Sequence, residues 1–173
     1  MPLLKFGRPI QDLWVTLGDD EPLADAPMIL SLARWKRDRE ALRGHNGALG
    51  IRLQPGQSPA EIADDLSRFG VVVLDFPVFK DGRPFSYARL LRDRYGFAGE
   101  IRASGHVLRD QYRFLHRCGV DALEVSADVD GEAAAEGWQQ AQAEISLAYQ
   151  PGTDGAPWIA RMRQRAQAAE AAE

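Results

Sequence analysis

The sequence predicts an α/β protein with a parallel sheet built from repeated βα units. Short apolar segments alternate four times with segments of helical periodicity between residues 48 and 149, and this order is typical of parallel strands joined by right-handed crossovers. Residues 71–74 are wholly apolar, as expected of a strand that is covered on both faces. Four units resemble half of a (βα)8 barrel, and four strands cannot close a barrel alone. We therefore expect a partial barrel whose inner face is covered by the N-terminal segment, by a second copy or by a partner.

The chain of 173 residues predicts a single α/β domain over residues 1–150. Residues 1–47 form an N-terminal extension, in which residues 13–17 and 28–30 have strand composition. A helix follows from the N-cap Ser31 to about Arg43. Residues 151–173 are expected to be a C-terminal tail that is partly disordered, because they combine a linker with a run of alanine and glutamate.

The four βα units occupy residues 48–149. Their strands are predicted at 48–53, 71–74, 100–103 and 121–125, and their helices at 59–69, 84–95, 107–118 and 132–149. The first of these helices has Ser58 as its cap and Pro59 at its first position. Val107, Leu115 and Cys118 lie on the apolar stripe of the third helix, where Gln111 is the one polar member.

Successive side chains of a strand point to opposite faces of the sheet, and this alternation predicts an apolar face toward the helices and a charged face opposite it. The charged face gathers four residues near the carboxyl ends of the strands, where α/β proteins bind ligands: Arg52, Asp75, Arg102 and Glu124. One interpretation is two structural ion pairs, Arg52 with Asp75 and Arg102 with Glu124. A second is a pocket in which Asp75 or Glu124 acts as general base and Arg102 stabilises an anion. A third is an interaction surface.

The charge of the chain is unevenly distributed. Residues 80–118 hold eight arginines and one lysine against four acids, a local charge of +5, whereas the whole chain has −4 and the remainder therefore −9. This asymmetry predicts a surface that binds something anionic. Arg89 and Arg92 share a helix face, which we expect to be solvated or to face a partner. The candidate ligand-binding residues are Arg52, Asp81, Arg83, Arg102, Arg109 and Gln111.

Two of these candidates also have plainer interpretations. Residues 80–83 contain Asp-Gly, which is typical of a tight turn, although Lys80 and Arg83 could hold an oxyanion there. Residues 102–105 lead into a predicted helix whose first N–H groups could also hold an anion. A buried Gln111 needs partners, and it either bonds the backbone or reaches the site.

Several classes of function are disfavoured. The net charge argues against nucleic acid and anionic lipid as partners. No apolar run approaches the ~18 residues that a membrane span needs, and the first residues do not resemble a signal peptide. The single cysteine, Cys118, excludes an internal disulfide and is expected in the core, which fits a cytoplasmic protein. The three histidines lack metal spacing, and there is no dinucleotide or phosphate-loop motif, so we expect neither metal nor cofactor.

Residues 75–92, with 99–103, 107–111 and 117–122, closely resemble a bacterial family known as domain of unknown function 934. The similarity also includes residues 12–15 and 32–35, so it spans roughly residues 10–125. Genes of that family typically lie beside those of assimilatory sulfite reductase, and its members carry oxidoreductase or sulfur-assimilation labels. The matching positions include Asp75, Asp81, Gly82, Arg83, Ser86, Arg89, Arg92, Arg102, Arg109, Asp110 and Gln111.

This resemblance implies an accessory protein of sulfite assimilation. Its arginine-rich carboxyl-end face would bind sulfite reductase or an anionic ligand. A small (βα)-class enzyme acting on a phosphorylated or sulfur-containing metabolite is the alternative, and the sequence leaves open whether the chain is an enzyme. A homodimer that completes the barrel-like interior is a third possibility, in which the charged face is structural.

Overall fold

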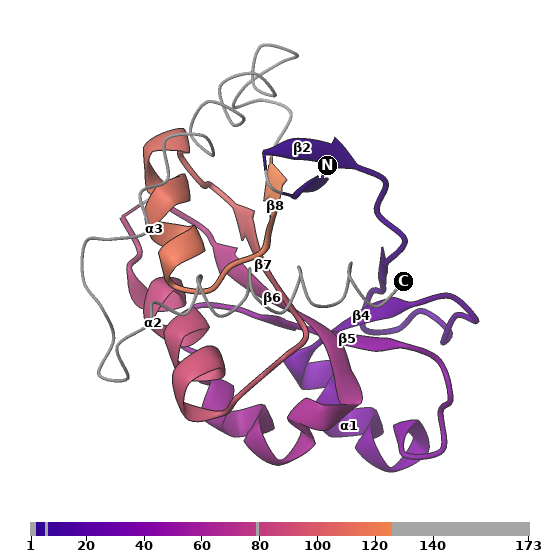
Figure 1. Ribbon diagram of the computed structural model, residues 1–173. Helices are drawn as coiled ribbons and strands as arrows, with labels where there is room; N and C mark the ends of the chain where they lie inside the picture. Colours follow the sequence, from indigo (N-terminus) through magenta and orange to yellow (C-terminus); the bar gives the residue numbers. More distant parts are fainter. Residues whose placement is uncertain (1–2, 6, 79, 126–173) are drawn as a thin grey trace, which may run out of the picture.

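The computed structural model describes residues 3–5, 7–78 and 80–125, and within them the chain forms one eight-stranded sheet with helices packed on it. The sheet is curled into a half-barrel, with strand order β2-β1-β8-β7-β6-β5-β4-β3 (Figure 1). The predicted helix at 132–149 and the tail at 151–173 lie outside the described residues. The strands are β1 (Leu3–Lys5), β2 (Arg8–Ile10), β3 (Val15–Thr16), β4 (Met28–Ser31), β5 (Leu49–Leu53), β6 (Phe69–Phe76), β7 (Glu100–Gly105) and β8 (Ala122–Val125).

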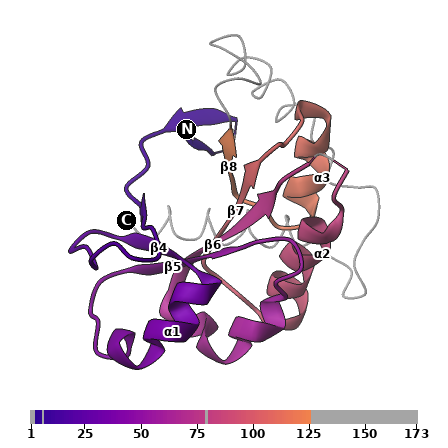
Figure 2. The same cartoon turned by 180° about the vertical axis from the view of Figure 1, so that it is seen from behind.

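The α/β class is confirmed, but the sheet is mixed rather than parallel as predicted. Strands β3 to β8 pair in parallel, each with its neighbour in the chain. The first ten residues add an antiparallel hairpin, because β1 pairs with β2 and also lies antiparallel to β8. The N-terminal extension therefore reaches both edges of the sheet, with β2 at one edge and β3 at the other (Figure 2).

The helical segments lie close to their predicted positions. They are α1 (Leu32–Leu42), the 3-10 helix η1 (Pro59–Arg68), α2 (Arg83–Arg89), the π-helical turn η2 (Leu90–Arg94), the 3-10 turn η3 (Arg109–Gln111) and α3 (Tyr112–Arg117). Both predicted caps are present. Ser31 Oγ accepts a hydrogen bond from the Arg34 N–H at 3.0 Å, and Ser58 forms a capping box with Glu61.

The two faces of the sheet differ as the alternation predicts. The face toward the helices carries the main core, in which Leu49, Ile51, Leu74, Ile101 and Leu123 are buried. The inner face has a small apolar cluster of Ile29, Val71 and Val73, against which Trp14 packs. The inner face also carries the charged residues of the strands, so the curled sheet places them together. Within the described residues no helix combines the length and apolar character that a membrane span requires.

Candidate functional site at the carboxyl ends of the strands

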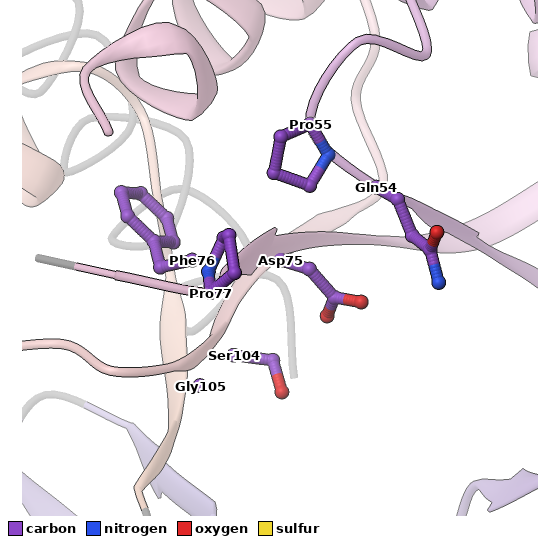
Figure 3. Close-up of a pocket in the computed structure, with 7 residues that line it drawn as sticks. All are labelled: Gln54, Pro55, Asp75, Phe76, Pro77, Ser104 and Gly105. Atoms are coloured by element: carbon purple, nitrogen blue, oxygen red, sulfur yellow. The ribbon is translucent and has the colours of Figure 1, made fainter. Parts of the chain in front are cut away.

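A pocket of about 560 Å³ opens at the carboxyl ends of β5, β6 and β7. Its polar side chains are Gln54, Asp75 and Ser104, and in Figure 3 the Asp75 carboxylate and the Ser104 hydroxyl point to the same side. Strand β6 runs to Phe76, two residues further than predicted, and so carries Asp75 into the site. The remaining lining residues are Pro55, Phe76, Pro77 and Gly105.

Asp75 is the titratable group of this pocket. Its side chain is 24% exposed, and Oδ1 accepts a hydrogen bond from Arg52 Nη1 at 2.6 Å. Oδ2 has no hydrogen bond within the part of the chain that the structure describes. Burial raises the pKa of Asp75, the Glu124 carboxylate adds to the effect, and Arg52 opposes it. A carboxyl group with a raised pKa at a pocket wall has the chemistry of a general base or acid.

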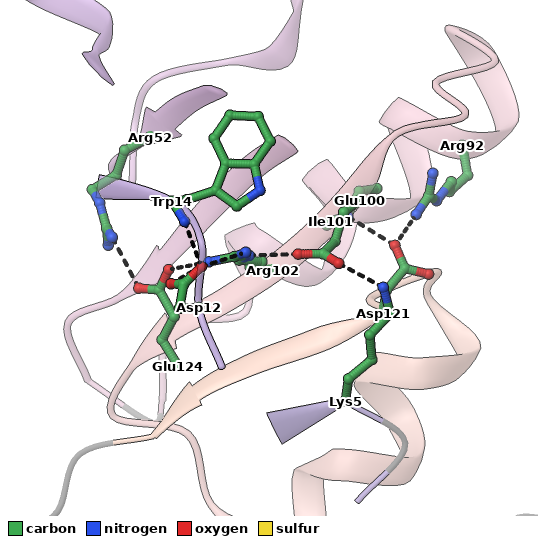
Figure 4. A network of polar contacts seen from close by, with 10 residues as sticks. All are labelled: Lys5, Asp12, Trp14, Arg52, Arg92, Glu100, Ile101, Arg102, Asp121 and Glu124. Carbon is green, nitrogen blue, oxygen red and sulfur yellow. Dashed lines mark hydrogen bonds and ion pairs between the residues drawn. The ribbon is translucent and has the colours of Figure 1, made fainter. Parts of the chain in front are cut away.

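Arg52 joins the predicted quartet into one network. Besides Asp75, it donates from Nη1 to Ser104 Oγ at 3.0 Å. Its Nη2 donates to Glu124 Oε2 at 2.9 Å, and Figure 4 shows this contact beside Arg102. Burial alone would lower the pKa of Arg52, but Glu124 and Asp75 outweigh it and raise that pKa. Arg102 Nη1 completes the quartet at 3.5 Å from Glu124 Oε1. The structure thus brings all four predicted residues together.

Arg102 is held from three sides by carboxylates. Its Nε donates to Glu100 Oε1 at 2.6 Å, and its two terminal nitrogens donate to the Asp12 carboxylate at 2.7 and 3.0 Å. Burial alone would lower the pKa of Arg102, but Asp12 and Glu100 outweigh it and raise that pKa. Arg102 is 2% exposed, beneath Asp12. This geometry argues against direct contact between Arg102 and an anionic ligand.

Asp12 is a network residue that the site prediction missed. It lies between β2 and β3, ninety positions before Arg102, and it belongs to residues 12–15, which are included in the expected family resemblance. The ring of Trp14, two residues later, lies over Gly50 and Gly70. A Cβ atom added to Gly50 would be 3.3 Å from this ring, and one added to Gly70 would be 3.1 Å from it. The N-terminal segment therefore covers part of the inner face, one of the three possibilities that the sequence left open.

The turn at residues 80–83 has the plainer of its two predicted forms. Asp81 accepts hydrogen bonds from the Arg83 backbone N–H at 3.1 Å and from Arg83 Nε at 2.9 Å, and these bonds hold the pKa of Asp81 below its usual range. The Arg83 guanidinium is exposed. Its Nη1 lies 3.8 Å from the position of a Cβ on Gly56, next to the pocket residue Pro55.

Arg92 does not lie on a solvated face, so the placement predicted for it is wrong. Its side chain is 3% exposed and binds Asp121 Oδ2 at 2.5 Å, with further bonds to the carbonyl oxygens of Phe97, Gly99 and Gly119. Arg92 lies in the π-helical turn η2, directly after α2, and its guanidinium contacts Gly119 and Asp121 in the loop before β8. Arg89 is 59% exposed and pairs with Asp93, so the two arginines do not share a surface.

The segment after β7 gives no anion site at a helix start. The His106 N–H donates to Phe76 O at 2.7 Å and the Val107 N–H to Gly105 O at 2.9 Å, and the helical turn begins only at Arg109. Gln111 Oε1 accepts from the Leu108 N–H at 3.1 Å, which is the backbone alternative for that residue. Arg109 is exposed, away from the pocket lining.

The other side chains that could react chemically have structural roles. Cys118 is buried, and burial raises the pKa of its thiol to about 11, as expected of a core residue. Among the described residues there is no group of three histidine, cysteine, aspartate or glutamate side chains placed to hold a metal ion.

Comparison with known proteins identifies the family. A family model described as bacterial protein of unknown function (DUF934) matches residues 50–158, more than half of the chain. The chain belongs to this family. The match includes β6 to β8 and all of β5 except Leu49, and therefore Arg52, Asp75, Arg102 and Glu124. No curated protein matches the chain.

Proposed function

We propose that this DUF934 protein is a cytoplasmic accessory protein of assimilatory sulfite reduction. It docks on sulfite reductase through the basic outer layer formed by α2, η2, η3 and α3. The link to sulfite reduction is the one that the family resemblance implies. The placement of the docking surface rests on the exposed charges of this layer.

The observation that supports this docking surface is the charge of the side chains that residues 80–118 expose. Seven basic side chains are exposed there, and four acids are exposed or half-buried: Asp81, Asp93, Glu100 and Asp110. Their balance is +3 on a chain whose net charge is −4. A concentrated field of one sign steers and orients an acidic partner. The basic residues are Lys80, Arg83, Arg89, Arg94, Arg109, Arg113 and Arg117.

An aromatic contact makes this layer one continuous surface. Phe85 of α2 and Phe114 of α3 lie with their ring centroids 4.8 Å apart. Phe114 is nevertheless 53% exposed, which is high for a large apolar side chain. Aromatic and arginine side chains are the residues most enriched at protein interfaces. The helix layer therefore offers both components of a docking surface.

The proposed docking surface differs from the carboxyl-end face that the sequence suggested. Arg52 and Arg102 on that face already bind carboxylates. The inner face as a whole sets three basic side chains, Lys5 included, against four carboxylates, a balance of −1. An acidic partner gains little from such a face.

A pull-down with purified assimilatory sulfite reductase tests the proposal. The chain is compared with an Arg89→Glu/Arg113→Glu variant at low salt and at about 0.3 M salt, where exposed charges are screened. We expect binding that weakens with salt and is lost in the variant. Arg43→Glu, which reverses an exposed charge at the C-cap of α1, outside the helix layer, should bind normally. Equal binding by all three proteins, or none by the parent chain, overturns the proposal.

A second candidate function is a small enzyme of the (βα) class, and the Asp75 pocket favours it. The general base would be Asp75, with Arg52 fixing its orientation. Turnover of a candidate phosphorylated or sulfur-containing metabolite that falls at least a hundredfold in Asp75→Asn would support it, since general-base catalysis contributes about 10²–10⁴-fold. Turnover that is unchanged in that variant would exclude Asp75 as the base.

A homodimer that completes the inner face is a third proposal. Trp14 and Asp12 already occupy part of that face, which leaves less of it for a second copy. Sedimentation equilibrium decides this point, because a monomer at every concentration removes the proposal.

A further inference from the structure

The charge of the Asp75 pocket selects for one class of ligand. Arg52 is the cation nearest to it, but Arg52 Nη1 is bonded to Asp75 and Ser104 and Nη2 to Glu124. Glu124 is shared with Arg102, and over the whole inner face three basic side chains stand against four carboxylates, a charge of −1. An anionic ligand in the pocket would meet the Asp75 carboxylate before it met any unneutralised cation.

The lining presents one charged acceptor that is not used. Asp75 Oδ2 accepts no hydrogen bond among the described residues, whereas the Ser104 hydroxyl and the Gln54 amide, which also line the pocket, can each donate as well as accept. A primary ammonium group carries three N–H donors and no acceptor. It can donate to Asp75 Oδ2, whereas a phosphate or sulfur oxyanion would place its own negative charge and acceptors against that carboxylate.

The rest of the lining suits a short carbon skeleton. Pro55, Phe76 and Pro77 supply apolar walls, and the pocket of about 560 Å³ lies within the usual range for small-ligand sites, which is about 300–1,000 Å³. Small-molecule sites typically combine such walls with a few placed polar groups.

We propose that this pocket binds a small primary amine, with the ammonium group on Asp75 Oδ2 and the carbon chain against the two prolines. The inference rests on the second candidate function and replaces its phosphorylated or sulfur-containing substrate by a cationic one. It also gives Ser104 a role, since its hydroxyl accepts from Arg52 and so holds Asp75 and the guanidinium in one orientation.

Calorimetric titration of the full chain tests the inference. The probes are 1,4-diaminobutane and ethanolamine as amines, glycerol as a neutral molecule, and inorganic sulfite, sulfate and phosphate as anions. We expect saturable binding of an amine, no saturable binding of the anions, and at least about a tenfold loss of amine affinity in Asp75→Asn. The asparagine side chain retains the volume and one acceptor for Arg52, and a thermal melt establishes that the variant is folded.

The matched control is Asp20→Asn, which removes a fully exposed carboxylate outside the pocket and should leave amine binding unchanged. Saturable binding of an anion that depends on Asp75, equal amine binding by Asp75→Asn, or no amine binding at all overturns the inference. Amine binding without turnover of any amine keeps the inference and removes the enzymatic function, so the two failures are distinguishable.

Discussion

Replacement of Arg92 by methionine should strongly destabilise this protein. Arg92 is buried, and its guanidinium binds Asp121 and three backbone carbonyl groups of the segments before β7 and β8. Methionine fills part of the volume. Among the described residues it leaves the buried Asp121 carboxylate with one hydrogen-bond donor, the Ile101 N–H. Breaking a buried ion pair by removal of one partner costs about 3–5 kcal/mol. Because domains are stable by about 5–15 kcal/mol, this loss is a large part of the total.

The assay is urea unfolding followed by circular dichroism, with the slope of the transition checked for constancy. Arg89→Met is the matched control, because Arg89 lies three residues away but forms an exposed pair with Asp93 at 3.2 Å. Such pairs contribute about 0–1 kcal/mol. The reasoning is refuted if Arg92→Met lies within about 1 kcal/mol of the parent protein, or if the control costs as much.

The pH dependence of this variant has a defined sign. Burial raises the pKa of Asp121, and Arg92 opposes the shift, so loss of Arg92 raises that pKa further. An acid whose pKa is higher in the folded state favours folding when protonated and opposes it as pH rises. The difference in unfolding free energy between parent and Arg92→Met should therefore shrink as pH falls from about 7 toward the titration range of carboxyl groups. A difference that grows on acidification would contradict this assignment.

Three further predictions concern the backbone, the inner network and the thiol. Gly105→Ala should lower the free energy of unfolding in urea by about 1–3 kcal/mol, because Gly105 has φ +98° and a Cβ there would stand 2.5 Å from a carbonyl oxygen of β6. Gly82→Ala, where the space is open, should not change the free energy of unfolding. Equal losses in the two variants would refute the reasoning. Asp12→Asn should cost about 1–3 kcal/mol in the same assay, because it removes a charge that faces buried Arg102, and an unchanged midpoint would show that the contact contributes nothing. Cys118, whose pKa is raised to about 11, should resist a thiol reagent at about pH 8 until the protein unfolds; rapid labelling of the folded protein would contradict its burial.

Much of the fold follows from local signals in the sequence. Ser31 and Ser58 have the cap chemistry that begins a helix, and both form the predicted capping contacts. Alternation in the strands assigned Arg52 and Asp75 to one face because the side-chain period of a strand is two. The hairpin of β1 and β2 gave no comparable signal, since each strand has only three residues and the second contains Pro9.

The misplaced residues depend on contacts between distant parts of the chain. The helical periodicity of the sequence predicted that Arg92 is solvated. Its partner Asp121 is twenty-nine residues away, and its other acceptors are backbone groups. Asp12 joins the network only because the N-terminal segment crosses the inner face to reach Arg102. Side-chain pattern reports which face of an element a residue occupies, and it carries no information on which distant group neutralises it.

Arginine footprinting of the complex with sulfite reductase tests the proposed docking surface most directly. The chain is treated with phenylglyoxal alone and in the presence of the reductase, and modification of each arginine is measured by peptide mass spectrometry. We predict that Arg83 and Arg89 on the helix layer lose reactivity in the complex. Exposed Arg43, at the C-cap of α1, should keep its reactivity, and buried Arg102 should react in neither state. Unchanged reactivity at Arg83 and Arg89, or protection of Arg43 instead, would contradict the account.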